Sequence, residues 1–155
     1  MKKKIYSKWE TLIKNGFFDD YTYEAKRRYT KAFSWLKGIP KNAVILEIGC
    51  GTGRYHKLLK ENEFINVISS DITMEHIIRA KENNTNGIFN IASAEKLPYK
   101  SNSIDVVVSN AAIEHFDKPE VGVREISRVL KPGGKAVITS DCYSWRILQI
   151  IRLYR

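Results

Sequence analysis

A carboxylate and three closely spaced glycines stand together in the first strongly apolar part of the chain. Glu47 lies in the apolar run, and Gly49, Gly51 and Gly53 follow at alternate positions in VILEIGCGTGRY, residues 44–55. Glycines let a backbone approach a ligand closely and turn its N–H groups toward it. We therefore predict a ligand-binding loop to which Glu47 contributes a negative charge.

The charge of Glu47 separates two kinds of ligand for this loop. Dinucleotide-binding loops have the spacing G-x-G-x-x-G, and here the third glycine of that pattern would fall on Arg54. A carboxylate beside the loop would also repel a diphosphate, whereas it would attract an ammonium group. S-adenosylmethionine has no phosphate and carries an ammonium group, so we expect this ligand. An NAD-type oxidoreductase is the alternative.

The elements that must position the loop alternate between short apolar runs and amphipathic segments. Strands are predicted for AVILEIG, INVISSD, GIFNIAS, SIDVVVSN and KAVITSD. Helices are predicted for GRYHKLLKEN, TMEHIIRAKENN and PEVGVREISRVLK. This alternation is typical of a parallel sheet covered on both faces. The fold class is therefore α/β, a Rossmann-like three-layer α/β/α arrangement.

The two ends of the chain differ from the core, which we place at residues 41–142 of a single domain. Residues 8–15 and 22–37 predict helices, so we expect segment 1–40, rich in aromatic residues, to form an N-terminal helical cap and substrate lid. Packing of these aromatic side chains on the sheet is the alternative for part of the set.

The C-terminal segment, residues 143–155, predicts an amphipathic helix with an unusually wide apolar face. Such a face must be covered. Truncation of a longer chain is the first explanation, a homodimer the second, and a membrane interface the third.

The composition excludes several classes of protein. Of 155 residues, 43% are hydrophobic and 28% are charged, which is typical of a globular domain. No apolar run is long enough for a membrane span or a secretory signal, so we predict a cytoplasmic location. Cys50 and Cys142 have no nearby partner at metal-ligand spacing, and no metal is expected. The net charge of +9 comes from the two ends, since basic and acidic residues balance over 41–142.

Residues 44–55 resemble the first motif of class I S-adenosylmethionine-dependent methyltransferases, which typically reads acid-x-G-x-G-x-G. The likeness continues in SSDIT, where Asp71 takes the place of the acid that holds the ribose hydroxyls, and in EISRVLKPGGKAVITS, with a tight turn at 132–134 before the fifth strand. The resemblance implies a sheet of order 3-2-1-4-5, and a chain that lacks the family's last two strands.

The resemblance also implies which residues contact the cofactor. Ser93 stands where the family often has an acid beside the adenine, and Asn110 ends the fourth predicted strand, where ligands of open parallel sheets bind. The full predicted set is Glu47, Gly49, Gly51, Gly53, Asp71, Ile72, Ser93, Ala94, Glu95 and Asn110.

The expected reaction is methyl transfer to a small-molecule acceptor, with S-adenosylhomocysteine as the product. His115, just past the fourth strand, is the candidate general base, and a structural histidine is the alternative. Basic residues among the aromatics of segment 1–40 leave an RNA methyltransferase open, although no nucleic-acid partner is expected. A module that binds the cofactor without turning it over is a further alternative.

Overall fold

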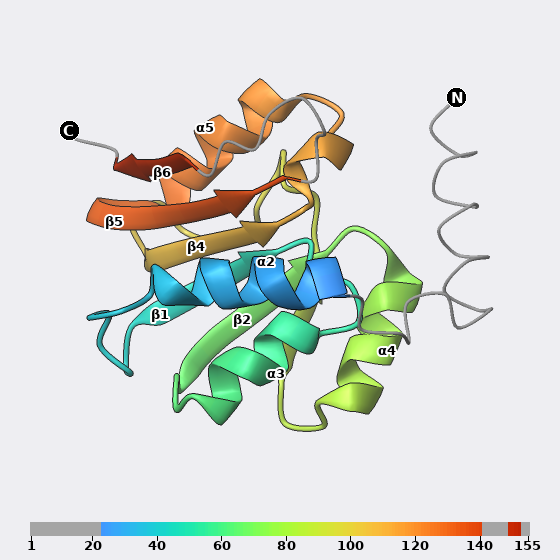
Figure 1. Cartoon of the computed structure of the whole chain (residues 1–155). Coiled ribbons are helices and arrows are strands. Elements are labelled where there is room, and N and C mark those ends of the chain that lie inside the picture. The colour runs from blue at the N-terminus through green and yellow to red at the C-terminus, as the bar shows by residue number, and fades with distance from the viewer. Residues whose placement is uncertain (1–22, 141–148, 153–155) are drawn as a thin grey trace.

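The computed structural model describes residues 23–140 and 149–152, and strands and helices alternate along most of this part of the chain (Figure 1). The regular elements are α2 (Tyr23–Ser34), β1 (Val44–Ile48), α3 (Arg54–Glu61), β2 (Asn66–Asp71), α4 (Met74–Asn83), β3 (Ile88–Ile91), β4 (Ile104–Asn110), η1 (Ile113–His115), α5 (Pro119–Val129), β5 (Leu130–Thr139) and β6 (Gln149–Arg152).

The strands form one sheet of order β3-β2-β1-β4-β5-β6. All pairs from β3 to β5 are parallel, and β6 adds to β5 in the antiparallel sense. The predicted order 3-2-1-4-5 is therefore confirmed. Because the parallel strands point the same way, their carboxyl ends meet at one edge of the sheet, where ligands of open α/β sheets bind.

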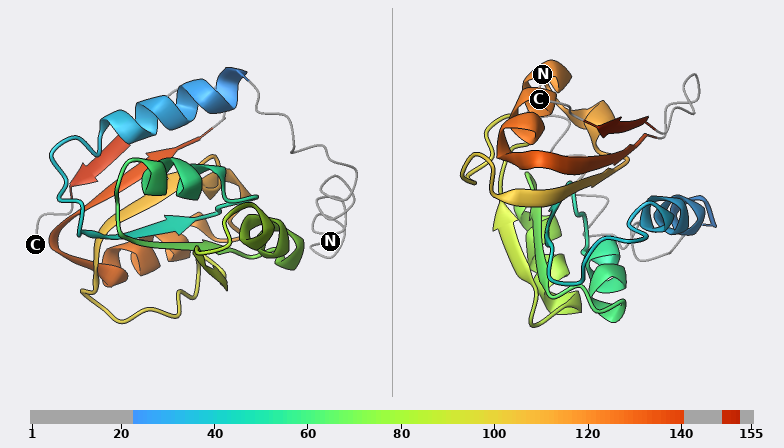
Figure 2. Two further views of the ribbon diagram at one scale, coloured as in Figure 1. Left: turned by 90° about the horizontal axis from the view of Figure 1, so that it is seen from below. Right: turned by 90° about the vertical axis from the view of Figure 1, so that its left-hand side faces the viewer.

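Helices cover both faces of the sheet, and Figure 2 shows α5 on the side opposite α2 and α3. On the α2 and α3 face, a core cluster joins these helices to the sheet through residues such as Leu36, Leu59 and Val106. On the α5 face, Ile126 and Val129 of the helix belong to a core cluster with side chains of the sheet, among them Leu46. The result is the predicted three-layer arrangement.

The predicted helix at 22–37 is observed as α2, and it packs on the sheet. Ala32 and Leu36 are buried in the cluster on that face, where Phe33 and Trp35 pack around it. These aromatic side chains thus take the packing role that was the alternative to a lid. The predicted helix at 8–15 lies outside the described residues.

At the C-terminus the structure differs from the predicted helix over 143–155. Residues Gln149–Arg152 form strand β6, and the rest of that segment lies outside the described residues. Pairing of Ile150 with Val137 and of Ile151 with Ala136 satisfies backbone groups of β5 that would otherwise form an open edge. Helical periodicity was therefore the wrong pattern for these four residues, because an available strand edge decided their conformation.

The turn predicted at 132–134 lies inside β5. The β4–β5 register shifts between Ile104 and Val106, so that Ile104 pairs with Leu130 whereas Val106 pairs with Lys135. Gly133 has a φ of 76°, which places it in the left-handed region. The segment is therefore an outward bulge in the strand, at the end of the sheet opposite the glycine loop.

Candidate active site at the carboxyl edge of the sheet

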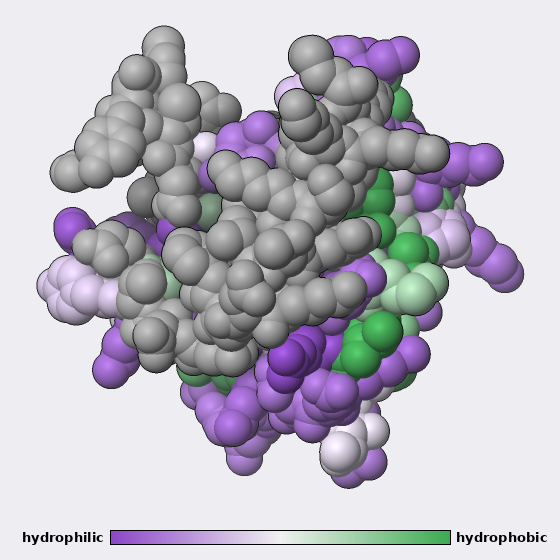
Figure 3. Space-filling view, turned by 90° about the vertical axis from the view of Figure 1, so that its right-hand side faces the viewer, coloured by the Kyte–Doolittle hydropathy of each residue, from purple (hydrophilic) through white to green (hydrophobic). Residues whose placement is uncertain are grey.

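The predicted site residues come from the ends of three adjacent strands. Glu47 lies near the end of β1, Asp71 ends β2, and Asn110 ends β4, and β1 lies between the other two. The topology therefore brings these three polar side chains to one edge of the sheet. Figure 3 looks onto the side of the molecule toward which the parallel strands point, and its coloured atoms are mostly hydrophilic, with smaller hydrophobic areas between them.

The glycine loop connects β1 to α3 through three left-handed residues. Gly49, Gly51 and Gly53 have φ angles of 75°, 52° and 80°. A Cβ on Gly49 would collide with the Cβ of Ala112, so that glycine is required for packing against the loop after β4. A Cβ on Gly51 would meet no described atom within 4 Å, so its Cα faces open space.

The amides of the loop are largely used within the protein. The N–H groups of Gly49 and Cys50 donate to the carbonyl of Ser70, and that of Gly53 donates to the carbonyl of Cys50. The expectation that the loop would offer free N–H groups is therefore wrong for these residues. What Gly51 offers a ligand is close approach to a bare backbone.

Asp71 holds the loop and the start of α4 with its two carboxylate oxygens. Oδ2 accepts from the backbone N–H of Gly51 at 2.9 Å, and Oδ1 accepts from the N–H of Thr73 at 2.9 Å. Nδ1 of His76 lies 3.1 Å from Oδ1. Burial alone would raise the pKa of Asp71, but His76 and the two amides together hold it below its usual value. Asp71 is therefore an anion at neutral pH.

Helix α4 begins without a side-chain cap among the described residues. Thr73 occupies the N-cap position, but its hydroxyl makes no capping hydrogen bond. Asp71 binds the Thr73 N–H, which precedes the first turn of the helix. The carboxylate therefore serves the loop as much as the helix. Ile72, between the two, is 45% exposed and can offer an apolar surface at this edge.

Glu47 is buried on the α3 face of the sheet in a chain of hydrogen bonds. Its Oε2 accepts from the hydroxyl of Ser69 at 2.7 Å, and the Ser69 oxygen lies 2.8 Å from Nδ1 of His56. Burial raises the pKa of Glu47 to about 8, with the Ser69 hydrogen bond opposing and the charge of Asp71 adding to the rise.

The segment predicted to receive the adenine follows β3 and is fixed by several hydrogen bonds. The Ser93 hydroxyl accepts from the N–H of Glu95 at 3.2 Å, and the Glu95 carboxylate accepts from the N–H of Lys118 at 2.6 Å. The Ala94 side chain is buried in the core on the α5 face. Of these three residues, Ser93 and the backbone of Ala94 thus keep the most capacity for a ligand.

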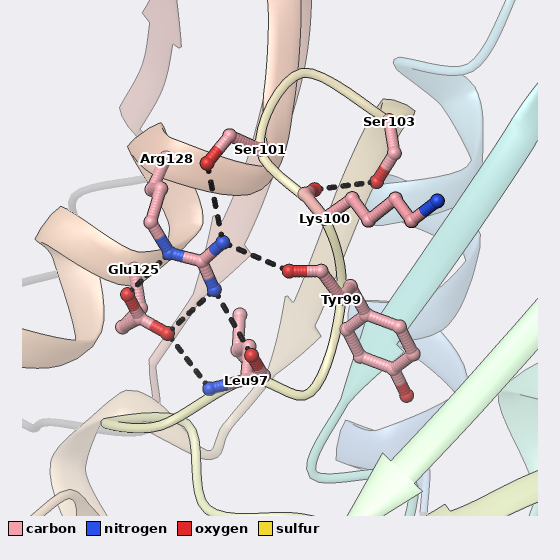
Figure 4. A network of polar contacts seen from close by, with 7 residues as sticks. All are labelled: Leu97, Tyr99, Lys100, Ser101, Ser103, Glu125 and Arg128. Carbon is pink, nitrogen blue, oxygen red and sulfur yellow. Dashed lines mark hydrogen bonds and ion pairs between the residues drawn. The ribbon is translucent and has the colours of Figure 1, made fainter.

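A network from α5 holds the next part of this loop (Figure 4). The Arg128 guanidinium donates to the carbonyls of Leu97 and Tyr99 at 2.9 and 2.8 Å, and it pairs with Glu125 at 2.6 Å. Glu125 in turn accepts the N–H of Leu97 at 2.8 Å. The path of residues 97–103, and with it the end of the Ser93–Glu95 segment, therefore depends on two side chains of one helix.

Asn110 presents an unused donor at the carboxyl end of β4. Its Oδ1 accepts from the hydroxyl of Thr139 on β5 at 3.2 Å, which fixes the orientation of the amide. Its Nδ2 is buried and has no hydrogen-bond partner among the described residues. A buried donor without a partner is costly, so a ligand acceptor at this position would satisfy it.

His115 lies in the short η1 turn that follows β4. Its side chain is exposed, and its N–H donates to the carbonyl of Ala112 at 2.9 Å. Ala112 is the residue that packs against Gly49. The turn that carries His115 is therefore anchored next to the glycine loop.

Sequence reasoning missed Ser69, His56 and Thr139. The alternation of β2 puts Ser69 on the same face as Val67, and His56 follows the buried Tyr55 on α3. The sequence shows that both are near the core, but only the register, in which Glu47 lies opposite Ser69, brings them to the carboxylate.

The described part of the chain was also compared with the requirements of a metal site and of a membrane-spanning helix. No group of three or more potential metal ligands occurs in residues 23–140. None of the helices in this range combines the length and apolar content that a membrane span requires.

The residues at this edge fit a ligand with a positive amino-acid end and a nucleoside. Glu47 provides an acid whose burial favours pairing with a cation, Gly51 leaves open space above the backbone, and Asn110 has an unsatisfied donor. The fold, with these polar groups at the ends of β1, β2 and β4, is that of an α/β class whose ligands bind at the carboxyl edge of the sheet.

Comparison with known sequences identifies the family. The pattern of the methyltransferase domain family matches residues 46–138. The chain is 31% identical over 118 residues to a tRNA (carboxymethyluridine(34)-5-O)-methyltransferase of Macaca fascicularis, covering 74% of this chain. It is 30% identical over 142 residues to phosphoethanolamine N-methyltransferase 3 of Arabidopsis thaliana, covering 88% of this chain. The chain belongs to the class I S-adenosylmethionine-dependent methyltransferase family, whose cofactor is S-adenosylmethionine.

The chain is much shorter than these relatives. The matched part spans 16% of the Macaca protein and 28% of the Arabidopsis protein. Among solved structures, the YcgJ protein from Bacillus subtilis superposes with a TM-score of 0.69 at 25% identity, over 74% of this chain and 50% of that one. The similarity therefore covers the cofactor-binding fold, with the remaining parts of the longer proteins unmatched.

Proposed function

We propose that this chain transfers the methyl group of S-adenosylmethionine to a small-molecule acceptor. The observation that carries the proposal is that three neighbouring strands bring Glu47, Asp71 and Asn110 to the edge of the sheet where the glycine loop begins. Asp71 binds the N–H of Gly51, whose Cα faces open space. In this arrangement Glu47 pairs with the cofactor ammonium, and Asp71 accepts from the ribose hydroxyls with the lone pairs that its protein partners leave. Ser93 and the Ala94 backbone contact the adenine.

Methyl transfer depends mainly on alignment of the acceptor with the methyl group of the cofactor. S-adenosylmethionine supplies a methyl group already activated by its sulfonium, so holding the acceptor in line with that group provides much of the rate. Asn110, oriented by Thr139, borders the reacting centre and helps to fix the geometry. A proton must also leave when the acceptor is a protonated nitrogen or oxygen.

His115 is the residue that we propose as the general base. It lies on the turn after β4, anchored by Ala112 against the glycine loop. A histidine is suited to proton transfer near neutral pH. Replacement by glutamine should lower kcat and leave the affinity for S-adenosylhomocysteine unchanged.

RNA is the second candidate acceptor. It is favoured by the tRNA methyltransferase among the relatives and by the basic residues at the ends of the chain. Against it, basic and acidic residues balance over 41–142, which contains the site. Small molecules are favoured by the phosphoethanolamine methyltransferase, which matches a larger share of the chain.

The experiment has two stages, both with the full chain. Calorimetric titration with S-adenosylhomocysteine measures cofactor binding, and incubation with S-adenosylmethionine labelled in the methyl group then compares phosphoethanolamine, a panel of small amines and acids, and bulk tRNA as acceptors. Label in small molecules supports the proposal, and label in tRNA alone would transfer it to the second candidate. Binding without transfer to any acceptor would identify a module that holds the cofactor without turnover.

A further inference from the structure

Three buried polar side chains form a continuous chain beneath the glycine loop. Glu47 is 2% exposed, Ser69 0% and His56 1%. Glu47 and Ser69 are direct neighbours in the parallel β1–β2 register, and His56 reaches Ser69 from α3. None of the residues predicted for the cofactor site, apart from Glu47, takes part in this chain.

The direction of the hydrogen bonds follows from the single proton of a hydroxyl group. Ser69 donates that proton to Glu47 Oε2, so the Ser69 oxygen is left to accept from Nδ1 of His56. The proton of the neutral imidazole is thus assigned to Nδ1. Nε2 then carries a lone pair and has no hydrogen-bond partner in the described part of the chain. Burial, and the charge of Lys60, lower the pKa of His56 to about 4, which keeps the ring neutral.

Among the described residues, the other titratable groups that interact with Glu47 bring it no positive charge. Asp71 approaches from β2, Cys50 from the loop and Tyr55 from α3, with Tyr29 of α2 behind Tyr55. Burial, and then the negative charges of Glu47 and Asp71, raise the pKa of the Cys50 thiol. Burial is also the main cause of the raised pKa of Tyr55, so both groups stay neutral. Glu47 is thus held as a neutral acid at neutral pH unless a cation arrives.

We propose that Ser69 and His56 are positioning residues that lower the cost of ionising Glu47, and that cofactor binding releases the Glu47 proton to solvent. The O–H bond of the Glu47 carboxyl breaks as its proton passes to the buffer, and the resulting carboxylate pairs with the ammonium. The hydroxyl of Ser69, polarised by His56, stays aimed at Oε2 and stabilises the anion. The inference rests on the proposed contact between Glu47 and the cofactor ammonium.

The hydrogen-bond chain can be tested without any ligand. The carboxyl carbon of Glu47 is followed by ¹³C NMR against pH in the full chain, and the titration midpoint should lie near 8. Ser69→Ala should raise the midpoint by about one to two units, the range for a hydrogen bond to a charged group. His56→Leu should also raise it, whereas His56→Asn, whose amide can replace Nδ1 as donor, should restore it toward the wild-type value.

The matched control is the neighbouring serine on the same strand. Ser70 is as buried as Ser69, but its hydroxyl donates to the backbone carbonyl of Glu47 and not to the carboxylate. Ser70→Ala should leave the midpoint unchanged. A midpoint that is equally insensitive to Ser69→Ala, or that lies at the ordinary value for glutamate in the wild type, would overturn the role of Ser69 and His56.

Coupling to the cofactor is measured by calorimetry of S-adenosylhomocysteine in buffers of different ionisation enthalpy. At about pH 6.5 both Glu47 and the α-amino group of the ligand are protonated, so close to one proton should be released per ligand bound. The wild type alone tests this. Glu47→Gln should release none, and 5′-methylthioadenosine, which has the nucleoside without the amino acid, should release none from the wild type.

The outcomes separate the two levels of the proposal. Binding of S-adenosylhomocysteine without proton release would overturn the ionisation of Glu47 and leave the cofactor site intact. Unchanged affinity in Glu47→Gln at about pH 8.5, where the acid is ionised, would instead remove the proposed contact with the ammonium.

Discussion

Asp71 accepts a hydrogen bond from the backbone N–H of Gly51 at 2.9 Å, and the two residues stand at opposite ends of the β1–α3–β2 crossover unit in the chain. The end of β2 thereby holds the loop that follows β1. With its other oxygen, Asp71 holds the N–H of Thr73 at the start of α4. One buried anion thus fixes both segments that border the proposed ribose position.

Replacement of Asp71 by alanine should weaken S-adenosylhomocysteine binding. Loss of a charge-assisted hydrogen bond costs about 1.5–3 kcal/mol, which corresponds to a rise in Kd of about 10- to 150-fold. Titration calorimetry measures it. Asp105→Asn is the control, since Asp105 binds Val44 and Lys131 near the start of the strands, and its Kd should be unchanged. An unaltered Kd for Asp71→Ala would contradict the ribose assignment.

Much of the fold could be predicted because each core element has a strong local pattern. Short apolar runs alternate with amphipathic segments, and only a parallel sheet with two helical layers buries both. The segment Gln149–Arg152 was mispredicted because its side chains suit a helix or a strand equally. Pairing with the edge of β5 favours the strand. This edge is a tertiary feature, which cannot be predicted from the local sequence pattern.

The candidate site could be predicted only in part, for a similar reason. The places of Asp71 and Asn110 at the carboxyl edge of the sheet could be predicted because each residue ends a recognisable strand. The hydrogen-bond chain from His56 through Ser69 to Glu47 depends on the β1–β2 register and on the side of α3 that meets the sheet. A one-residue shift of β2 would have turned Ser69 to the other face, and the sequence does not fix that register.

Because the Cα of Gly51 faces open space, Gly51→Ala should affect ligand binding more than it affects folding stability. Gly51→Ala should cost roughly 1–2 kcal/mol of folding free energy, because its φ of 52° is unfavourable for a residue with a Cβ. The new methyl group would also enter the space proposed for the cofactor, so the Kd for S-adenosylhomocysteine should rise by more than the strain alone explains. Urea denaturation and calorimetry measure the two effects.

Gly133→Ala is the matched control for Gly51→Ala. Gly133 also has a left-handed φ, of 76°, and a Cβ there would meet no described atom within 4 Å. It lies in the β5 bulge, away from the glycine loop. A similar loss of stability with an unchanged Kd is expected. Equal effects of the two substitutions on Kd would contradict the placement of the ligand over Gly51.

The buried carboxyl of Glu47 predicts how stability changes with pH. The pKa of Glu47 is raised from 4.5, its value in the unfolded chain, to about 8 in the folded protein. Between these values only the folded protein keeps the proton of this carboxyl group. The free energy of unfolding therefore decreases as the pH rises toward 8. His56 acts in the opposite sense, but only between about pH 4 and 6.5. From about pH 6.5 to 8, Glu47→Gln should therefore gain about 2 kcal/mol relative to the wild type, at about 1.4 kcal/mol per unit.

Urea denaturation without ligand at several pH values measures this difference. The change with pH is the quantity of interest, so any constant effect of the substitution cancels. Glu61→Gln, on the exposed end of α3, is the control and should follow the wild type in parallel. A Glu47→Gln curve that also runs parallel to the wild type would show that Glu47 is ionised in the folded protein.

The contacts of Arg128 predict that one side chain of α5 stabilises the loop of residues 97–103 (Figure 4). Arg128→Leu removes donors from the carbonyls of Leu97 and Tyr99 and takes from Glu125 its cationic partner, leaving it, among the described residues, only the N–H of Leu97. We expect a loss of about 1–2 kcal/mol, since the site is partly exposed and solvent replaces some of the bonds. Hydrogen exchange at the N–H of Leu97 should accelerate with it.

The exposed pair on α4 provides the comparison for Arg128. Arg79 lies 3.8 Å from Glu82, and both side chains are largely exposed. Because such pairs contribute little, Arg79→Leu should change stability by less than about 0.5 kcal/mol. The proposed adenine position, at Ser93 and Ala94, adjoins the Leu97 loop in the chain, so Arg128→Leu should also weaken S-adenosylhomocysteine binding, whereas Arg79→Leu should not. Normal exchange at Leu97 in Arg128→Leu would mean that the carbonyl contacts do not hold the loop.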